Sequence, residues 1–267
     1  GKLVYRAFLE RKLKGIDIVA INELGSIESS YHLLKYDSTH GKLNFDISIN
    51  KNSFKYDNKI VKFFNEKNPQ KLPWKKLNVD IVLECSGFFA SRELSFKHIQ
   101  AGAKKVLISA PGSNVDATIV KGVNNNILSK DHKIISNGSC TTNCLAPVVM
   151  ILNKELKILS GFMTTVHSYT GDQKTVDQVH TDLRRARAAA DSFIPTSTGA
   201  AKAIDLVLPE MEGKLDGTAI RVPTSNVSLI DLTFTCNIKT SVKKINNLMI
   251  KASKSSKLKN ILTINSL

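Results

Sequence analysis

The stretch Ser136-Asn-Gly-Ser-Cys-Thr-Thr-Asn-Cys-Leu-Ala-Pro147 places a small, hydroxyl-rich turn directly before an apolar run that is typical of a buried helix. If this helix begins near Ser139, Cys140 lies in its first turn. There, unpaired backbone N–H groups and the positive end of the helix dipole favour a thiolate over a thiol. The stretch therefore predicts a nucleophilic cysteine. Because Pro147 removes a hydrogen bond from a helix interior, we expect the helix to bend or to begin later.

Short apolar runs alternate with helical patterns before this stretch. The runs that we expect to be strands are Ile16–Ile21, Val79–Cys85, Lys105–Ser109 and His132–Ser136. This alternation predicts a Rossmann-like, mostly parallel sheet, with ligands bound beyond the carboxyl ends of its strands. An insert rich in lysine and asparagine, at residues 42–78, is predicted to add a hairpin at the edge of that sheet.

The pattern changes after the cysteine. A predicted strand at Ile158–His167 leads into a long polar segment. Two alternating runs, Gly217–Pro223 and Asn226–Asn237, follow one another closely enough to predict an antiparallel pair. We therefore expect an α/β chain with a Rossmann-like domain at residues 1–139, followed by an α+β domain with an antiparallel sheet at residues 140–267.

The composition is that of a globular protein with a large excess of positive charge. The 38 Lys and Arg residues exceed the 23 Asp and Glu residues, which gives a net charge of +15. Such an excess suggests a polyanionic partner, nucleic acid above all, but the lysines are scattered, which favours solvated basic faces. The four cysteines form no disulfide framework, and neither a membrane span nor a signal peptide is recognisable. We therefore expect a cytoplasmic protein without a membrane partner.

Side chains able to move a proton or bind an anion follow several of the predicted elements. His167 closes a β-branched run and is the candidate base, although a single histidine at a strand end is more often structural. Cys144 completes a C-x3-C spacing that matches no zinc or thioredoxin motif, so we expect a buried thiol and no metal site. The donors suited to phosphate or an oxyanion, each of which could instead be a cap or turn residue, are Ser139, Thr141, Thr170, Thr198, Gly199 and Arg221.

Four long motifs resemble one known family. They are Ser136–Pro147, Thr164-Thr-Val-His-Ser-Tyr-Thr-Gly-Asp-Gln173, Pro195-Thr-Ser-Thr-Gly-Ala-Ala-Lys-Ala203 and Arg221-Val-Pro-Thr-Ser-Asn-Val-Ser228. The motifs, and their order along the chain, resemble those of phosphorylating glyceraldehyde-3-phosphate dehydrogenase of the bacterial type. The similarity extends over nearly the whole chain. The resemblance implies that Cys140 attacks the aldehyde to give a hemithioacetal, with His167 as the base. Oxidation by NAD then leaves a thioester, which inorganic phosphate cleaves to 1,3-bisphosphoglycerate.

The resemblance also implies roles for the remaining candidates. Thr170 and Arg221 match residues around the substrate phosphate, with Asp172 nearby. The residues that match those around the attacking phosphate are Ser139, Thr141, Thr198 and Gly199, joined by Arg185. The matching cofactor positions are Gly1, Glu23, Ser86, Gly87, Phe88 and Ser109, and an acid at Glu23 favours NAD over NADP. A homotetramer is expected, and no metal is implied.

Two alternatives and one departure from the family stay open. Gly1 matches the last glycine of the family's pyrophosphate-binding turn, and the family continues past Leu267. Both ends therefore look truncated, and we expect these 267 residues to bind NAD poorly and to have little activity. Erythrose-4-phosphate dehydrogenase is the related alternative, although it tends to lack the pattern of Thr170 and Thr198-Gly199. A non-catalytic basic protein that binds nucleic acid is the alternative of another class, and its binding would fall steeply with salt.

Overall fold

The computed structural model describes residues 1–265, which divide into two compact units. Unit 1 comprises Gly1–Asp116 and Lys130–Ser136, and unit 2 comprises Ala117–Ser129 and the described residues from Asn137 onward. Among the helices of residues 1–265, none combines the length and the apolar character needed to cross a bilayer.

Unit 1 combines helices with two main sheets and a small hairpin. Its helical segments are α1 (Lys2–Arg11), α2 (Ile27–Lys35), α3 (Arg92–Gln100) and the 3-10 turn η1 (Pro69–Lys71). Its strands are β1 (Ala20–Asn22), β2 (Tyr36–Asp37), β3 (Gly41–Lys42), β4 (Ser48–Asn50), β5 (Ser53–Tyr56), β6 (Lys59–Phe64), β7 (Ile81–Glu84), β8 (Lys105–Ile108) and β10 (Ile134–Ser136). The strands β7, β8 and β10 are parallel, as predicted. The predicted hairpin is present, because β5 pairs antiparallel with both β4 and β6, but it lies in the sheet of β1 and not at the edge of the sheet of β7, β8 and β10.

The first predicted strand is shorter than expected and lies in a separate sheet. Only Ala20–Asn22 pairs with a neighbour, parallel to β6. Ile16 is 57% exposed, so the residues before Ala20 bury little apolar surface that would favour an extended pairing. No strand among residues 1–265 hydrogen-bonds to both β1 and β7, and the parallel pairs therefore belong to two sheets.

The apolar face of α1 covers the sheet of β1, β6, β5 and β4. Tyr5, Phe8 and Leu9 recur at helical spacing and are all buried. They pack in one cluster with Phe54 and Tyr56 of β5, and the aromatic rings meet at tilted or edge-to-face angles. The helix is thereby fixed against the β4–β6 side of the sheet.

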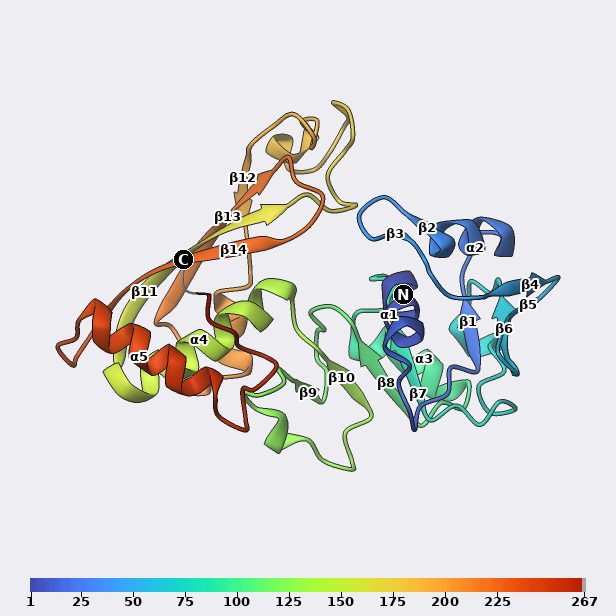
Figure 1. Ribbon diagram of the computed structural model, residues 1–267, viewed down its shortest axis with the longest axis horizontal. Coiled ribbons are helices and arrows are strands. Elements are labelled where there is room, and N and C mark those ends of the chain that lie inside the picture. Colours follow the sequence, from blue (N-terminus) through green and yellow to red (C-terminus); the bar gives the residue numbers. More distant parts are fainter. Residues whose placement is uncertain (266–267) are drawn as a thin grey trace. The chain divides into compact units, whose positions relative to one another are not determined.

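Unit 2 is built around a mixed four-stranded sheet. The strands of this sheet are β11 (Ile158–Ser168), β12 (Ile194–Ser197), β13 (Leu215–Val222) and β14 (Ser228–Cys236), while the short strand β9 (Ala117–Thr118) pairs outside it, next to β10. The helices of unit 2 are α4 (Cys140–Leu156) and α5 (Val242–Ser253), with 3-10 turns η2 (Asn125–Ile127), η3 (Leu183–Ala186), η4 (Lys202–Leu206) and η5 (Pro209–Met211). The order across the sheet is β12-β13-β11-β14, and α4 and α5 lie side by side on one face of it (Figure 1).

The expected pairing of the last two strands with one another is wrong. The central strand β11 lies between them, parallel to β13 and antiparallel to β14. Because β11 is eleven residues long and largely covered, its backbone groups need partners along both edges, and this order supplies them. The sheet is therefore mixed, with antiparallel pairs at β11–β14 and β12–β13.

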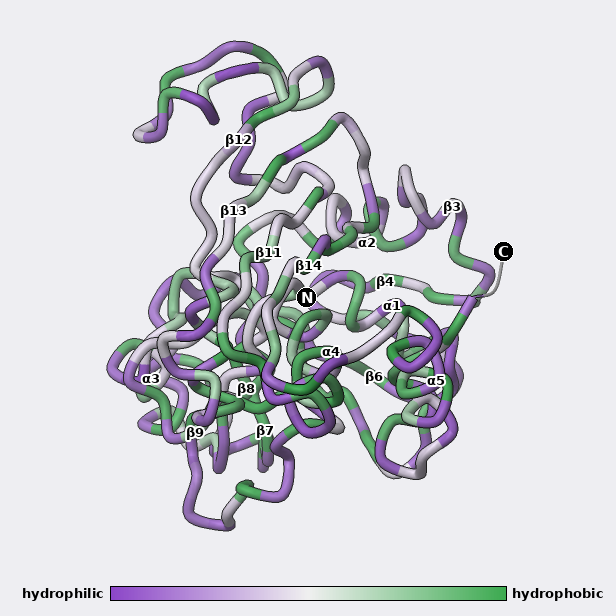
Figure 2. Tube along the Cα trace, turned by 90° about the vertical axis from the view of Figure 1, so that its left-hand side faces the viewer, coloured by the Kyte–Doolittle hydropathy of each residue, from purple (hydrophilic) through white to green (hydrophobic). Residues whose placement is uncertain are grey.

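Helix α4 begins at Cys140, as the opening stretch predicts. Ser139 is its N-cap, and the Ser139 hydroxyl accepts a hydrogen bond from the backbone N–H of Thr142 at 2.9 Å. Pro147 does not delay the start of the helix but lies buried inside it. Leu145 and Val149 are fully buried in the core of unit 2, and Figure 2 shows α4 as a largely hydrophobic segment. This packing compensates for the hydrogen bond that the proline removes.

Candidate active site

Cys140 and His167 lie in direct contact. The Sγ atom of Cys140, in the first turn of α4, is 3.1 Å from Nε2 of His167, the penultimate residue of β11. His167 is only 6% exposed, whereas Cys140 is open to solvent. A thiol at a helix N-terminus beside an imidazole is an arrangement that activates cysteine as a nucleophile.

The second ring nitrogen of His167 is oriented by the neighbouring strand. Nδ1 lies 2.7 Å from the carbonyl oxygen of Ser168 and 2.7 Å from Nη1 of Arg221, which occupies the paired position on β13. With the Nδ1 proton directed at the Ser168 carbonyl, Arg221 donates to the same carbonyl at 3.0 Å, and its Nη1 is a close neighbour of Nδ1 without donating to it. The lone pair of Nε2 then faces Sγ of Cys140.

The surroundings of His167 keep its imidazole neutral. Burial lowers the pKa of His167, and the positive charge of Arg221 adds to this lowering against the opposing effect of the Ser168 carbonyl. A histidine whose pKa lies below the usual value of about 6.5 carries no charge at pH 7. The imidazole is therefore able to accept a proton from the thiol.

A tight turn after β11 presents Thr170 and Asp172, and buried Gln173 organises it. The Gln173 Oε1 atom accepts from the backbone N–H of Thr170 at 2.8 Å and from its hydroxyl at 3.2 Å. The Gln173 Nε2 atom donates to Asp172 at 3.1 Å. The sequence did not single out Gln173, and the signal available was only its place in the Thr-Gly-Asp-Gln turn. Its side chain fixes the position of the Thr170 hydroxyl.

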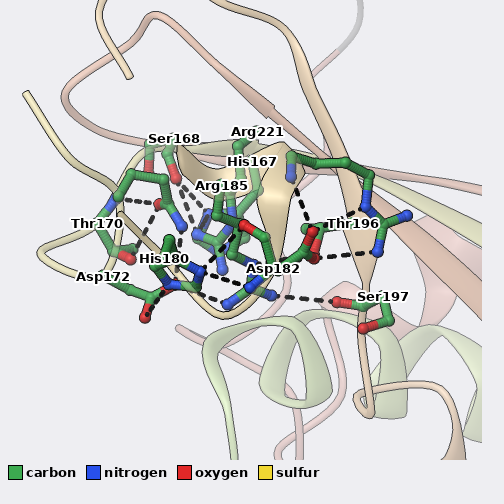
Figure 3. A network of polar contacts seen from close by, with 12 residues as sticks. His167, Ser168, Thr170, Asp172, His180, Asp182, Arg185, Thr196, Ser197 and Arg221 are labelled. Atoms are coloured by element: carbon green, nitrogen blue, oxygen red, sulfur yellow. Dashed lines mark hydrogen bonds and ion pairs between the residues drawn. The ribbon is translucent and has the colours of Figure 1, made fainter. Parts of the chain in front are cut away.

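Arg185 joins Asp172 to strand β12 (Figure 3). Its Nη1 donates to Asp172 at 2.6 Å, and its Nε donates to the hydroxyl of Thr196 at 2.9 Å. The Thr196 hydroxyl donates in turn to Asp182 at 3.0 Å, and His180 lies 3.4 Å from Asp172. Burial acts to raise the pKa of Asp172, but the bonds from Arg185 and His180 lower it overall. Asp172 is therefore ionised, and the guanidinium of Arg185 is held in place.

Three members of this network were not predicted from the sequence: His180, Asp182 and Thr196. His180 and Asp182 lie in a long polar segment without helical or strand periodicity, and Thr196 lies on the short strand β12. Asp182 caps the short η3 turn by accepting from the backbone N–H of Arg184 at 3.0 Å. The polar run His180-Thr181-Asp182 was the one local signal, and it predicts a turn and not a site.

Arg221 retains an unused donor. Its buried Nε atom has no hydrogen-bond partner among the described residues. Burial lowers the pKa of Arg221, and the charge of Arg185 adds to this shift, which indicates two guanidinium groups near one another. A buried donor without a partner is costly unless a ligand satisfies it. The arrangement suits a dianionic group such as a phosphate.

The other predicted phosphate ligands divide into two pairs. Ser139 and Thr141 begin α4, where the Ser139 hydroxyl serves as the N-cap and Thr141 is 6% exposed. Thr198 and Gly199 form the turn before η4, where the Thr198 hydroxyl accepts from the backbone N–H of Ala200 at 3.2 Å. No hydrogen bond between described residues joins the two pairs, and their common role stays a prediction.

Cys144 was expected to be buried, and this expectation is wrong. It is exposed, because four helical positions bring it back toward the side of Cys140, while its neighbour Leu145 faces the core. Within residues 1–265, the His, Cys, Asp and Glu side chains form no cluster of three that could hold a metal ion.

The predicted cofactor positions lie in unit 1. Glu23 follows β1, and its Oε1 atom accepts from the backbone N–H groups of Leu24 at 2.8 Å and Gly25 at 3.2 Å. Gly1 is the N-cap residue of α1, and no side chain caps this helix start. The first N–H groups of α1 are therefore available to a ligand.

A turn after β7 contains three more of these positions: Ser86, Gly87 and Phe88. Gly87 has φ of +79°, a left-handed conformation that favours glycine, and Phe88 is 80% exposed. Ser109, after β8, donates its backbone N–H to the carbonyl of Glu84 at 2.9 Å. The ends of β7 and β8 therefore lie next to one another, as parallel strands require.

Comparison with known proteins decides the family. Residues 139–267 match the family described as glyceraldehyde 3-phosphate dehydrogenase, C-terminal domain, and residues 1–92 match the one described as its NAD binding domain. The chain belongs to the glyceraldehyde-3-phosphate dehydrogenase family. A glyceraldehyde-3-phosphate dehydrogenase from Xanthobacter flavus is 52% identical over 262 residues, which cover 98% of this chain and 78% of that protein. One from Geobacillus stearothermophilus is 51% identical over 263 residues, which cover 98% and 78% of the two chains.

The residues of unit 1 fit the dinucleotide that a glyceraldehyde-3-phosphate dehydrogenase requires. Glu23 offers a carboxylate at the carboxyl end of β1, where an acid accepts hydrogen bonds from a ribose hydroxyl. The uncapped start of α1 offers N–H groups of the kind that bind pyrophosphate. The exposed ring of Phe88 offers an apolar surface to a planar base. Acidic, anion-binding and aromatic groups are thus all present.

Proposed function

We propose that the protein oxidises glyceraldehyde 3-phosphate to 1,3-bisphosphoglycerate in glycolysis, with NAD and inorganic phosphate, through a covalent bond to Cys140. Residues 1–139 bind the cofactor in this proposal, and residues 140–267 carry the reacting groups. The observation that carries it is the 3.1 Å contact between Sγ of Cys140 and Nε2 of His167 at the start of α4.

His167 moves the protons of the first half-reaction. Its neutral Nε2 removes the thiol proton as Sγ of Cys140 attacks the aldehyde carbon, and it returns that proton to the oxygen to complete the hemithioacetal. Nε2 takes the hydroxyl proton again as the hydride leaves the same carbon, which yields the thioester. NAD supplies the hydride acceptor when it is bound.

Inorganic phosphate completes the cycle at the thioester. A phosphate oxygen attacks the acyl carbon, the C–S bond breaks, and the thiolate of Cys140 leaves next to the protonated His167, which returns its proton. Arg185, held by Asp172 and Thr196, supplies fixed positive charge for an anion. We assign inorganic phosphate to Arg185 together with Ser139, Thr141, Thr198 and Gly199. We assign the phosphate of the substrate to Thr170 and Arg221.

Arg221→Ala is expected to raise KM for glyceraldehyde 3-phosphate by about 10- to 100-fold, because a charged hydrogen bond to the substrate phosphate is lost. The acid limb of the pH profile is expected to move to higher pH as well, since the charge that helps to lower the pKa of His167 is removed. Initial rates of NADH formation over a range of pH check both effects. Arg187→Ala is the matched control, because Arg187 is exposed and pairs with Asp177. An unchanged KM in Arg221→Ala would contradict the assignment.

A homotetramer in the cytoplasm is proposed as the working form. Phe162 and Leu229 are exposed and lie at sheet positions that alternate with the buried, helix-covered ones. Val179 and Phe193 are exposed in the loop between β11 and β12, which alternates between hydrophilic and hydrophobic segments in Figure 2. Exposed apolar surface of this kind supports association with other copies, and the four free cysteines support a reducing compartment. The mass of the protein in solution tests the assembly, and a monomer would contradict it.

The direct test of this function measures NADH formation by the purified full-length protein. We expect glyceraldehyde 3-phosphate to be oxidised only when inorganic phosphate is present, because phosphate is needed to release the acyl group from Cys140. Erythrose 4-phosphate in place of the substrate, and NADP in place of NAD, are expected to react more slowly. Faster oxidation of erythrose 4-phosphate, or oxidation that is independent of phosphate, would contradict the proposal.

A further inference from the structure

A buried chain of hydrogen bonds in unit 1 ends at the turn after β7. The Trp74 indole N–H donates to Nδ1 of His98 at 3.0 Å, and Nε2 of His98 lies 3.1 Å from Oε2 of Glu84. The other oxygen of Glu84, Oε1, accepts from the backbone N–H of Ser86 at 2.6 Å and also from the Ser86 hydroxyl. The Ser86 hydroxyl in turn accepts from the backbone N–H of Phe88 at 3.1 Å.

The indole of Trp74 determines the direction of the first two of these hydrogen bonds. An indole N–H can only donate, so Nδ1 of His98 must accept. The single proton of the neutral imidazole therefore lies on Nε2, where it donates to the carboxylate of Glu84. The ring of Phe89 meets the His98 ring edge-on, and the Trp74 ring stacks beside it, which holds the imidazole in this orientation.

Burial makes the donors to Glu84 necessary. Trp74, Glu84 and His98 are each 5% exposed, and an isolated carboxylate at such a place is costly. Burial acts to raise the pKa of Glu84, but the hydrogen bonds from His98 and Ser86 outweigh it and lower the pKa overall. The carboxylate therefore stays ionised, and it holds both the backbone and the hydroxyl of Ser86.

We propose that His98 is a positioning residue for NAD: through the carboxylate of Glu84 it holds the Ser86–Phe88 turn in the conformation that contacts the cofactor. The inference rests on the proposed function, in which Ser86, Gly87 and Phe88 line the cofactor. His98 itself is buried on α3 and acts through its neighbour. Without its N–H, Glu84 loses one donor and becomes free to turn, and the Ser86–Phe88 turn loses its anchor.

Two conservative variants separate the two nitrogens of His98. In His98→Gln the terminal amide reaches the place of Nε2 and still donates to Glu84, whereas in His98→Asn the shorter amide replaces Nδ1 and still accepts from Trp74. We expect His98→Asn to raise KM for NAD by about tenfold, or about 1.4 kcal/mol of binding free energy, with kcat at saturating NAD unchanged. We expect His98→Gln to bind NAD as the unchanged protein does. Glu84→Gln, which removes the charge but keeps the size, should resemble His98→Asn.

The fluorescence of Trp74 provides a readout that needs no cofactor, because Trp74 is the single tryptophan of the chain. Its emission should shift to shorter wavelength in His98→Gln, in which the indole N–H loses its acceptor, and should stay near the original value in His98→Asn.

Ile99→Ala, on the same helix and packed against the same core, is the control for lost packing. It should lower the melting temperature without changing KM for NAD.

The outcomes separate this inference from the proposed function. A raised KM for NAD in His98→Asn and Glu84→Gln, but not in His98→Gln or Ile99→Ala, supports the inference. Equal KM values in His98→Asn and His98→Gln, with an active enzyme, would overturn it, as would a Trp74 emission that His98→Gln leaves unchanged. Failure of the proposed function would show differently, as an absence of NADH formation by the unchanged protein.

Discussion

Cys140→Ser is expected to lower kcat by at least about 10⁴-fold, because the serine hydroxyl stays protonated at neutral pH and is a far weaker nucleophile than a thiolate. The substitution exchanges one atom at the start of α4, where Sγ contacts His167 and the helix is capped by Ser139. The fold should therefore be unaffected. Initial rates of NADH formation at saturating substrate and phosphate measure the loss, and thermal unfolding confirms that the variant is folded.

Cys144→Ser is the matched control for this substitution. It makes the same chemical change four residues further along the same helix, at an exposed cysteine. We expect its turnover to equal that of the unchanged protein. Iodoacetamide should also label Cys140 faster than Cys85, Cys144 or Cys236. A Cys140→Ser protein that retains its turnover would place the nucleophile elsewhere.

His167→Asn is expected to lower kcat by about 10²- to 10⁴-fold, the usual contribution of a general base. Asparagine places an amide where Nδ1 lies, near the Ser168 carbonyl, but leaves no group at the position 3.1 Å from Sγ of Cys140. Both proton transfers of the first half-reaction then lack their acceptor. The rate at which iodoacetamide alkylates Cys140 should fall as well, and this measurement is independent of turnover.

The pH dependence of the unchanged protein should report the same group. Because burial lowers the pKa of His167, its imidazole stays neutral to a lower pH than that of an exposed histidine. Activity should therefore be full above this pKa and fall as the pH decreases through it, with a midpoint below about 6.5. His32→Asn, at an exposed position on α2, should leave the profile unchanged. Equal alkylation rates in His167→Asn and the unchanged protein would contradict the role of His167.

The features that the sequence predicted correctly depend on groups a few residues apart. The Ser139 hydroxyl reaches the N–H of Thr142 within one helical turn, so the start of α4 at Cys140 follows from local chemistry. The parallel strands β7, β8 and β10 follow from short apolar runs at regular intervals. The local preference of Pro147 suggested a later start for the helix. This prediction was wrong because the core packing of α4 outweighs that preference.

The sequence by itself determined the nucleophile, the alternation of strands and helices in unit 1 and the motifs of the family. Only the tertiary structure decided which side chains surround the nucleophile. Arg221 contacts His167, 54 residues away in the sequence, because β13 pairs with β11 in one particular register. The sequence alone had suggested a different strand order. His98 and Glu84, in the same way, meet only where α3 packs on β7. Such contacts depend on strand order, register and burial, which arise from the free energy of the whole fold and leave no local pattern in the sequence.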